Sequence, residues 1–455
     1  MNDLNFNEIL RSDAPIHLIG VGGVSMRALA RMLKDMGAHV RGSDRDSSIY
    51  TLQLDEQGIP VAIGHRPDNV RDAGLVIRTA AIKDDNPEVV AARAQKIPVI
   101  SRAEAWGFIM EHYSKVVCVA GTHGKTSTTA MIATFAESAS LDPTVMVGGD
   151  LPSIGGTLRI GHGELFVAEA CEYQNSFLSF HPTLAVILNI DRDHLDFFKD
   201  TADIIASFRT FAQLTPADGA VILNGDDENC RKMARDLDRE VITFGFGEGC
   251  DVRAVNQAFR NGLNCCDVLY KGDLYCRMAL KVPGDHNLMN ALSAAAVAIR
   301  LGVPSEDFAN GIGAYNGVGR RFEFKRAWRD AKVYDDYSHH PTEIEAALKA
   351  ARSLEPNRVV CVFQPHTYSR TVSLLDEFAQ ALSHADKVIL CPIFAAREVN
   401  TYGVSSEDLA KRIPGAEVAA DLRQAAQMLG EQVQPGDLIF TMGAGDVCKL
   451  VQYLN

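Results

Sequence analysis

Short runs of apolar residues, many of them β-branched, recur along the chain between stretches of helical period. Runs of about four to eight such residues without polar alternation are typical of strands buried on both faces of a parallel sheet. The apolar spacing at 26–36, 130–139 and 288–301 predicts helices that cover such sheets. The pattern therefore predicts an α/β protein. The expected strands lie at 16–20, 39–42, 61–64, 75–78, 98–100, 116–120, 165–168, 183–190, 220–224, 331–334, 358–363, 387–390 and 437–442, with a β-rich region at 240–282.

The chain is too long for one ordinary domain. Its 455 residues exceed the roughly 250–300 residues at which a single hydrophobic core stops growing. A polar stretch at 111–115 precedes a fresh strand, and a stretch rich in glycine and arginine at 316–323 precedes a further α/β segment. We therefore predict three domains, at residues 1–113, 114–321 and 322–455.

The first strand leads into a glycine-rich turn, formed by Gly20, Gly22 and Gly23, and then into a helix. Asp44 follows the second strand, about where a ribose-binding acid lies in dinucleotide-binding βαβ units. Ser25 replaces the third glycine of the fingerprint, so the turn could equally serve only to join strand and helix. Because strand carboxyl ends face the ligand crevice of such sheets, two loop residues are further candidates for contact, His65 and Thr79.

The stretch VVCVAGTHGKTSTT at 116–129 predicts a phosphate-binding loop. A buried strand ends in a turn with Gly121 and Gly124, and a helix begins near Lys125. Backbone N–H groups and the positive end of a helix dipole bind phosphate well. Lys125 would reach the outer phosphates, and the hydroxyl of Thr126 would take a bridging Mg²⁺. Since one glycine of the usual Walker pattern is absent, a plain strand–helix turn with an incidental lysine is the alternative.

Acidic and imidazole side chains follow two other strands of this region. Glu169 ends one strand, which is the usual position of the second Mg²⁺ anchor beside a phosphate loop. His194 follows the next strand, and on position alone it could be a metal ligand or a hydrogen bonder that orders the loop. In the last domain, similar loops at 335–343, 364–370 and 443–446 predict either a further site or a solvated surface with helix caps.

Composition excludes several classes of function. The formal net charge is −13, which disfavours non-specific binding to nucleic acid or to anionic membranes. The N-terminus lacks the apolar core of a signal peptide, and no apolar run approaches the length of a membrane span. Ten scattered cysteines without metal spacing are typical of reduced thiols in a cytoplasmic protein.

These parts together favour an ATP-dependent ligase or kinase. A phosphate loop with an acid at a neighbouring strand end indicates a nucleoside triphosphate with Mg²⁺, and the flanking domains indicate two further ligands. An NAD-dependent oxidoreductase would explain the first βαβ unit but leaves Lys125, Glu169 and His194 without a role. A P-loop motor or regulatory protein would explain the loop but not the two flanking domains.

The chain resembles the Mur ligases of peptidoglycan synthesis. The resemblance rests on HLIGVGGVSM, GSD, GTHGKTSTT, EACE, NIDRDHLD, GDHNLMNALSAAA, GVGRRFE, YDDYSHHPTE and FQPHTYSR, in this arrangement, and spans nearly the whole chain. It implies an N-terminal Rossmann-like domain for a UDP-sugar, a central ATPase domain and a C-terminal Rossmann-like domain for an amino acid.

Within this family the motifs are most similar to those of members that add L-alanine to UDP-N-acetylmuramate. The resemblance implies that the lactyl carboxylate attacks the γ-phosphate of ATP to give an acyl phosphate and ADP. The amine of L-alanine then displaces phosphate to leave an amide, in a cytoplasmic step of cell-wall synthesis that supports cell shape and division. The alternative within the family is a recycling ligase that joins UDP-N-acetylmuramate to an intact tripeptide.

The resemblance also implies roles for individual residues. Lys125, Glu169, His194 and Arg321 would be catalytic, with Thr126 and Glu169 on one Mg²⁺ and His194 on another. The implied ATP-binding residues are Gly121, Thr122, His123, Gly124, Lys125, Thr126, Ser127, Asn189, His286, Asn290, Arg321 and Asp336. The implied UDP-sugar contacts are Gly20, Gly22, Gly23, Asp44, His65, Thr79 and His123, and the implied amino-acid contacts are Tyr337, His339, His366 and Arg370.

Two departures from the family pattern concern these sites. The family commonly shows E-A-D-E-S-D where this chain has EACEYQ, so Cys171 stands in place of an acid. Many members carry an arginine where Thr367 stands, which leaves Arg370 to hold the amino-acid carboxylate with less help.

Overall fold

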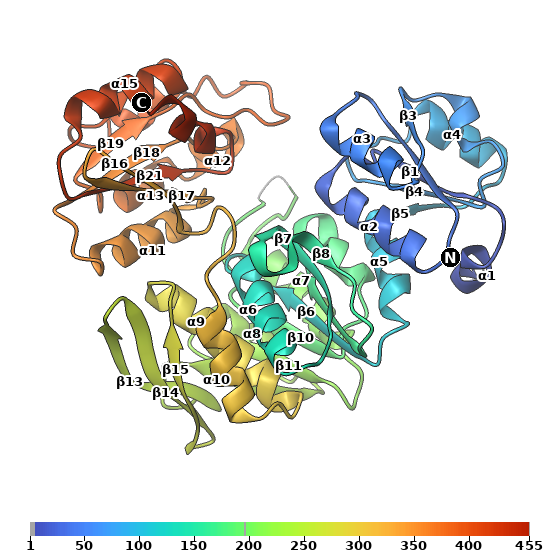
Figure 1. The fold of residues 1–455 in the computed structure, drawn as a ribbon, viewed down its shortest axis with the longest axis horizontal. Coiled ribbons are helices and arrows are strands. Elements are labelled where there is room, and N and C mark those ends of the chain that lie inside the picture. The colour runs from blue at the N-terminus through green and yellow to red at the C-terminus, as the bar shows by residue number, and fades with distance from the viewer. Residues whose placement is uncertain (1–4, 195–196, 455) are drawn as a thin grey trace.

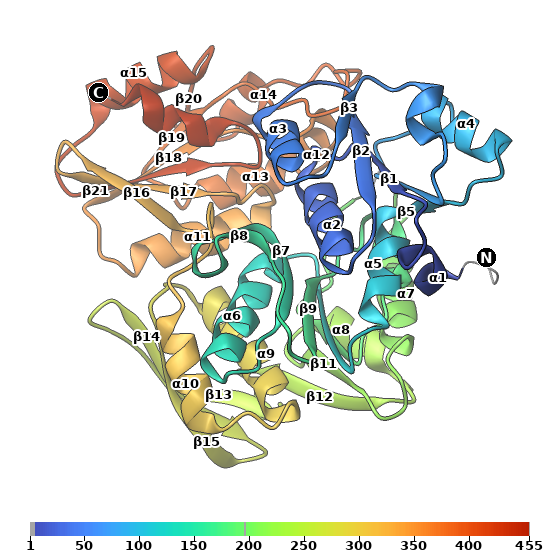
Figure 2. The ribbon, with the colours of Figure 1, turned by 45° about the vertical axis from the view of Figure 1, so that its right-hand side comes forward.

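The computed structural model describes residues 5–194 and 197–454, and these residues form three α/β domains (Figure 1). Each domain contains one sheet, of five, ten and six strands in chain order. The first and last domains both lie above the same end of the central domain (Figures 1 and 2). The prediction of an α/β fold with Rossmann-like outer domains is confirmed. Across the described residues, no helix has both the length and the apolar character that a membrane crossing requires.

The N-terminal domain is built on a fully parallel sheet in the order β3-β2-β1-β4-β5. All five strands predicted in this part of the chain are present, and the glycine-rich turn joins β1 to α2 as expected. The elements are α1 (Phe6–Leu10), β1 (Ile16–Ile19), α2 (Val24–Asp35), β2 (Val40–Asp44), α3 (Ile49–Glu56), β3 (Val61–Ile63), η1 (Pro67–Val70), β4 (Leu75–Arg78), α4 (Pro87–Ala94), β5 (Val99–Ser101) and α5 (Arg102–Met110).

The central domain has the strand order β15-β14-β13-β12-β11-β10-β6-β9-β7-β8, with the phosphate-loop strand β6 inside the sheet. The β-rich region predicted at 240–282 closes one side as an antiparallel meander of β13, β14 and β15. The elements are β6 (Lys115–Ala120), α6 (Lys125–Ser138), β7 (Thr144–Leu151), η2 (Pro152–Ile154), β8 (Gly156–Arg159), β9 (Leu165–Glu169), η3 (Tyr173–Ser179), β10 (Leu184–Ile187), α7 (Thr201–Gln213), β11 (Ala220–Asn224), α8 (Glu228–Ala234), β12 (Glu240–Gly245), β13 (Val252–Arg260), β14 (Leu263–Tyr270), β15 (Asp273–Leu280), α9 (Asp285–Arg300) and α10 (Ser305–Ala314).

The C-terminal domain has the order β16-β17-β21-β18-β19-β20, in which only β16 runs antiparallel to its neighbour. The four strands predicted here are confirmed. The elements are β16 (Glu323–Trp328), β17 (Ala331–Asp336), α11 (Pro341–Arg352), β18 (Arg358–Phe363), α12 (Tyr368–Ser373), α13 (Leu375–Leu382), β19 (Lys387–Leu390), α14 (Ser406–Ala410), β20 (Glu417–Val418), α15 (Leu422–Gln432), β21 (Asp437–Met442) and η4 (Val447–Tyr453).

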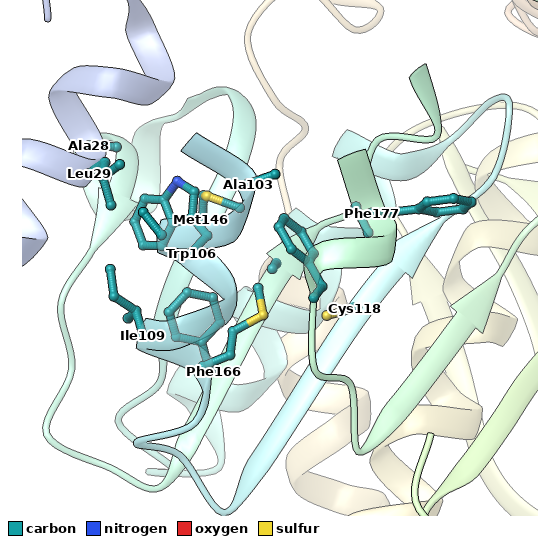
Figure 3. Packing of buried hydrophobic residues seen from close by; sticks show 14 of the residues in the cluster. Ala28, Leu29, Ala103, Trp106, Ile109, Cys118, Met146, Phe166 and Phe177 are labelled. Carbon is teal, nitrogen blue, oxygen red and sulfur yellow. The ribbon is translucent and has the colours of Figure 1, made fainter. Parts of the chain in front are cut away.

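The first two domains share one hydrophobic core. Helix α5 carries Trp106, which is 1% exposed, and its ring centroid lies 5.9 Å from that of Phe166 on β9 (Figure 3). Leu29 of α2 and Met146 of β7 belong to the same buried cluster. The buried clusters of the C-terminal domain, in contrast, contain only residues beyond Phe322. The exact domain boundaries stay a prediction, although the three sheets begin and end within the proposed ranges.

Candidate active site

The predicted phosphate loop connects β6 to α6 through two glycines with positive φ. Gly121 has φ +144° and Gly124 has φ +86°, a region that residues with a side chain rarely adopt. A Cβ on Gly124 would also lie 2.6 Å from Oδ1 of Asn290. Gly124 is the N-cap of α6 and offers no side-chain cap, so the first N–H groups of α6 face outward for an anion.

Lys125 is held by the loop and by a buried carboxylate. Its Nζ donates to the backbone oxygens of Gly121 (2.5 Å) and Thr122 (3.2 Å) and to Oε2 of Glu172 (2.8 Å). Burial alone would lower the pKa of Lys125, but the negative charge of Glu172 raises it above its usual range. Lys125 therefore carries a fixed positive charge. Sequence reasoning did not assign Glu172 a role, although its position three residues after Glu169 was a usable signal.

Thr126 and Glu169 meet directly, as a shared Mg²⁺ site requires. Oγ1 of Thr126 donates to Oε2 of Glu169 (2.9 Å), and the same oxygen accepts the N–H of Gly148 (2.8 Å). A hydroxyl beside a carboxylate at the start of a phosphate-loop helix is the donor set that Mg²⁺ prefers. The residues present thus fit the metal that the sequence predicts.

His194 lies near Glu172, the carboxylate that pairs with Lys125. Its Nε2 is 3.9 Å from Oε1 of Glu172 and 3.8 Å from Oδ2 of Asp193, and its ring packs on Tyr173 with centroids 4.6 Å apart. Its φ of +53° is uncommon for a residue with a side chain. An imidazole between two carboxylates could hold a second cation. Leu195 and Asp196 of the same sequence stretch lie outside the described residues.

His123 connects the phosphate loop to the C-terminal domain. Its Nδ1 lies 3.4 Å from Oε1 of Glu343, and its Nε2 lies 3.5 Å from Oδ2 of Asp191. Burial would lower the pKa of His123, but these two carboxylates raise it to about 9. Nη1 of Arg321 is also 3.4 Å from Oε1 of Glu343. Glu343 is a functional candidate that the sequence pattern indicated only as part of the loop at 335–343.

A cavity of about 420 Å³ opens between the central and C-terminal domains beside the loop. Two of the predicted ATP-binding residues in its wall already use their polar atoms in the protein. Asn189 accepts from the N–H of His123 (2.8 Å) and donates to its carbonyl (3.0 Å), and Asp336 accepts the N–H groups of Phe322 and Ser338 (both 2.7 Å). The predicted residues that line the cavity are His123, Gly124, Ser127, Asn189, His286, Asn290, Arg321 and Asp336.

A larger cleft of about 1090 Å³ is lined by all three domains. The phosphate loop contributes Lys125 and Thr126, and the C-terminal domain contributes Tyr337 and His339. Thr122 lies in the same wall, where its Oγ1 accepts the N–H of Asp191 (2.9 Å). The N-terminal domain contributes two cations that sequence reasoning missed, Arg27 and Arg31. Their spacing of four residues on the helix after the glycine turn was the available signal.

The residues predicted to contact the UDP-sugar gather at the β1–α2 turn. The N–H of Gly22 donates to Oδ2 of Asp44 (2.8 Å), and a Cβ on Gly20 would lie 3.0 Å from Cγ2 of Thr79. Gly23 is the N-cap of α2, directly before Val24 at the edge of the large cleft.

His65 lies in a separate polar cluster of the N-terminal domain. Its Nδ1 is 3.4 Å from the buried carboxylate of Glu88, which also accepts from Ser43 (2.6 Å) and from Asn69. Burial opposes ionisation of Glu88, but the hydrogen bonds from His17, Ser43 and Asn69 lower its pKa to about 2. His65 is thus positioned by a group that the sequence pattern did not reveal.

Of the predicted amino-acid residues, Tyr337 and His339 line the large cleft, whereas His366 and Arg370 lie behind them, with the rings of His339 and His366 5.9 Å apart and Nη1 of Arg370 3.4 Å from Nδ1 of His366. Nη2 of Arg370 lies 2.8 Å from Oδ1 of Asp193, so its guanidinium joins the two domains. Nδ1 of His339 is 3.3 Å from Glu343, and the ring of His366 stacks on Phe394 at 5.7 Å. Burial lowers the pKa of His339 to about 3 and that of His366 to about 4, so both are neutral at pH 7.

Comparison with known proteins agrees with this architecture. The Mur ligase family catalytic domain matches residues 15–114, the Mur ligase middle domain 119–298, and the Mur ligase glutamate ligase domain 320–445. The UDP-N-acetylmuramate–L-alanine ligase of Clostridium novyi is 45% identical and is covered over 98% of each chain. That of Acetivibrio thermocellus is 46% identical over 96% of this chain and 94% of its own.

Solved structures give the same result. A UDP-N-acetylmuramate–alanine ligase from Thermotoga maritima is 29% identical, covers 96% of this chain and 98% of its own, and superposes with a TM-score of 0.80. A murein peptide ligase from Psychrobacter arcticus shares the fold at 22% identity, with a TM-score of 0.71 over 97% of this chain and 98% of its own. Since relatives above 40% identity span almost the full length, the chain belongs to the Mur ligase family.

Proposed function

We propose that the protein is an ATP-dependent ligase that joins L-alanine to the lactyl carboxylate of UDP-N-acetylmuramate. The observation that carries this proposal is the match, end to end and at 45–46% identity, to relatives with that name. The large cleft supports it, because three domains there surround one phosphate loop, as a reaction with three substrates needs. The step belongs to peptidoglycan precursor synthesis, and we place it in the cytoplasm, where ATP and reduced thiols such as the ten free cysteines occur.

The 420 Å³ cavity is proposed as the adenosine site. It adjoins Gly124 and Ser127, so a nucleoside there would direct its phosphates along the start of α6. His286 and Asn290 would contact the base, and Asp336 and Arg321 would contact the ribose and the phosphates. Lys125 is proposed to turn from Glu172 toward the outer phosphates when ATP binds.

Two Mg²⁺ positions are proposed. Thr126 and Glu169 would hold one ion, because they meet at the start of α6, and His194 with Glu172 would hold the other, because their side chains lie 3.9 Å apart beside Lys125. The bound ions would neutralise the phosphate oxygens and favour displacement at phosphorus.

The proposed reaction has two displacements. An oxygen of the lactyl carboxylate bonds to the γ-phosphorus, and the bond from this phosphorus to the leaving ADP oxygen breaks. The amine of L-alanine then attacks the carbonyl carbon, and the tetrahedral intermediate expels phosphate. Lys125 and Arg321 face the charge that develops in the first step, and fixed positive groups in a water-poor site are effective there.

The outer domains are proposed to place the other two substrates. The β1–α2 turn with Asp44, His65 and Thr79 would hold the UDP part, and Arg27 and Arg31 would face its diphosphate along the large cleft. On the opposite wall, Tyr337, His339 and His366 would surround L-alanine. Arg370 would hold the carboxylate of the amino acid, with Asp193 keeping its guanidinium in place.

Phosphate release from ATP tests this proposal. We expect release only with Mg²⁺, UDP-N-acetylmuramate and L-alanine all present, together with a product whose mass equals the two substrates less one water. Release with the tripeptide but not with L-alanine would instead indicate the recycling ligase. Release without either co-substrate, or reduction of a nicotinamide, would contradict a ligase.

A further inference from the structure

We propose that His123, Asp191 and His340 form a binding site for a transition-metal ion of the Zn²⁺ type, distinct from the Mg²⁺ positions. Each residue offers one ligand atom, and these three atoms lie within 4.8 Å of one another. His123 and Asp191 belong to the central domain, and His340 is the N-cap of α11 in the C-terminal domain. The ion would therefore bridge two domains.

The spacing suits a tetrahedral ion. Bonds of about 2.1 Å place the ligand atoms of a tetrahedral site roughly 3.4 Å apart. Nε2 of His123 lies 3.5 Å from Oδ2 of Asp191, which already matches that edge. The ligand atom of His340 lies within 4.8 Å of the other two, so the ring of His340 must move closer to complete three ligands. Water would take the fourth position.

Each histidine is oriented by an acceptor at its other ring nitrogen, as histidines that bind metals usually are. Nδ1 of His123 faces Oε1 of Glu343 at 3.4 Å, and Nε2 of His340 faces the carbonyl of Arg192 at 3.1 Å. Within the described part of the chain, the buried Nε2 of His123 has no hydrogen-bond partner. Nδ1 of His340 accepts only a long bond of 3.4 Å from the N–H of Thr342. An ion at these two nitrogens would therefore replace a proton on His123 and the capping hydrogen bond of His340.

The donor types favour a transition metal over Mg²⁺. Two imidazoles and one carboxylate are a typical Zn²⁺ set, whereas Mg²⁺ prefers oxygen donors such as those of Thr126 and Glu169. The Mg²⁺ ions needed for ATP therefore would not fill this site. The incoming ion takes the place of a proton on Nε2 of His123, and its positive charge meets the carboxylate of Asp191.

Occupation of the site would tie the phosphate loop to the C-terminal domain. His123 precedes Gly124 in that loop, and Glu343, its partner, lies on α11. A bound ion would fix the phosphate loop and the C-terminal domain relative to each other, and this would hinder exchange of nucleotide through the adjoining cavity. We therefore expect Zn²⁺ to slow phosphate release in the presence of excess Mg²⁺. A chelator specific for transition metals would restore it.

Cobalt binding by the full chain tests the proposal directly, because tetrahedral Co²⁺ absorbs strongly in the visible range. After removal of metals and addition of Mg²⁺, we expect one equivalent of Co²⁺ to give that absorption and Zn²⁺ to abolish it. His340→Gln should weaken Co²⁺ binding by more than about tenfold. The matched control is His384→Gln, in the same domain and 38% exposed, which should leave binding unchanged.

Two outcomes would overturn the proposal. One is the absence of a tetrahedral Co²⁺ spectrum in the unmodified protein, and the other is undiminished binding in a folded His340→Gln variant. If that variant does not fold, crystals of the unmodified protein soaked in Zn²⁺ decide the question. An anomalous peak between His123 and His340 is expected, and a peak only at surface histidines would contradict the site.

Discussion

Lys125 and Glu172 show how one pair of side chains can serve both stability and chemistry. The ion pair is buried, and the carboxylate of Glu172 lies 2.8 Å from Nζ of Lys125. We expect Lys125→Ala to lower phosphate release by at least about 10²–10³-fold, because a fixed charge opposite the transferring group is lost. Binding of the UDP-sugar, measured by calorimetry, should stay nearly intact. The surface variant Lys232→Ala serves as control, and full turnover in Lys125→Ala would contradict the assigned role.

The same substitution should also destabilise the fold. Removing Lys125 leaves Glu172 as an uncompensated buried charge, a loss of about 3–5 kcal/mol in comparable proteins. The double variant Lys125→Met with Glu172→Gln should recover the free energy of unfolding but not the activity. Recovery of both would mean that the pair has only a structural role.

Gly124 offers a second test at the residue scale. Because Gly124 has φ +86°, Gly124→Ala should lower the free energy of unfolding by about 1–2 kcal/mol through backbone strain alone. Because Asn290 lies so close, the added methyl group should also displace the loop. Gly37→Ala is a matched control, because Gly37 has φ +91° and a methyl group added there would meet nothing within 4 Å. Urea unfolding should show a similar decrease in the free energy of unfolding from backbone strain in both variants. Phosphate release should fall only in Gly124→Ala, and equal activity in the two would contradict a special role for this turn.

Single residues were predictable where one local pattern determines them. Gly121, Gly124, Lys125, Thr126 and Glu169 follow from the strand–glycine–helix spacing and from the acid at a strand end. Glu343 was not predictable in this way, and for Glu172 the only local signal is its position three residues after Glu169. Their partners Lys125 and His123 lie far away in the chain, and only the folded domains bring the charges together.

At the scale of elements, Glu88 shows how a helix is fixed to a sheet by polar contacts. It lies in the first turn of α4 and binds Ser43 of β2 and His17 of β1. Its pKa of about 2 is below the ordinary value of 4.5, so its stabilising contribution is present above pH 4.5 and is lost as the pH falls toward 2. This lowering of the pKa corresponds to a contribution of about 3 kcal/mol to the free energy of unfolding.

This linkage predicts a measurable difference under acid conditions. The free energy of unfolding of Glu88→Gln should fall less steeply than that of the unmodified protein as the pH is lowered below 4.5. Glu111→Gln, at a half-exposed surface position, should follow the unmodified curve. Parallel curves for the unmodified protein and Glu88→Gln would show that the carboxylate is not held in its charged form.

Strands with continuous apolar runs were predicted almost to the residue, whereas strands with another pattern were missed. β11, β18, β19 and β21 have the expected bounds, because they are buried on both faces. β16 was missed because its charged residues are exposed at the sheet edge. The hairpin of β7 and β8 was missed because glycines interrupt its apolar pattern, and pairing with β9 compensates for them.

At the scale of the whole molecule, the cores predict two units of unfolding. The N-terminal and central domains share a buried cluster through Trp106, and the C-terminal domain has its own around Trp328. Trp106→Ala should lower the stability of the first unit by about 3–5 kcal/mol and leave the other unchanged. Trp328→Ala should do the reverse. Scanning calorimetry with both variants checks this, and a single transition displaced equally by either change would contradict it.

The two outer domains are joined to the central domain in different ways, and this difference determines which substrate can bind first. The C-terminal domain touches the phosphate loop and its neighbours through polar contacts, such as the ion pair of Arg370 with Asp193 and the exposed hydrogen bond from Thr342 to Asp191. The N-terminal and central domains are joined by buried apolar surface, so they form one rigid unit. The UDP-sugar can therefore dock on the preassembled half of the site, whereas the adenosine cavity and the amino-acid side are complete only when the C-terminal domain is in contact. A compulsory sequence of arrival follows from how the three bodies are joined.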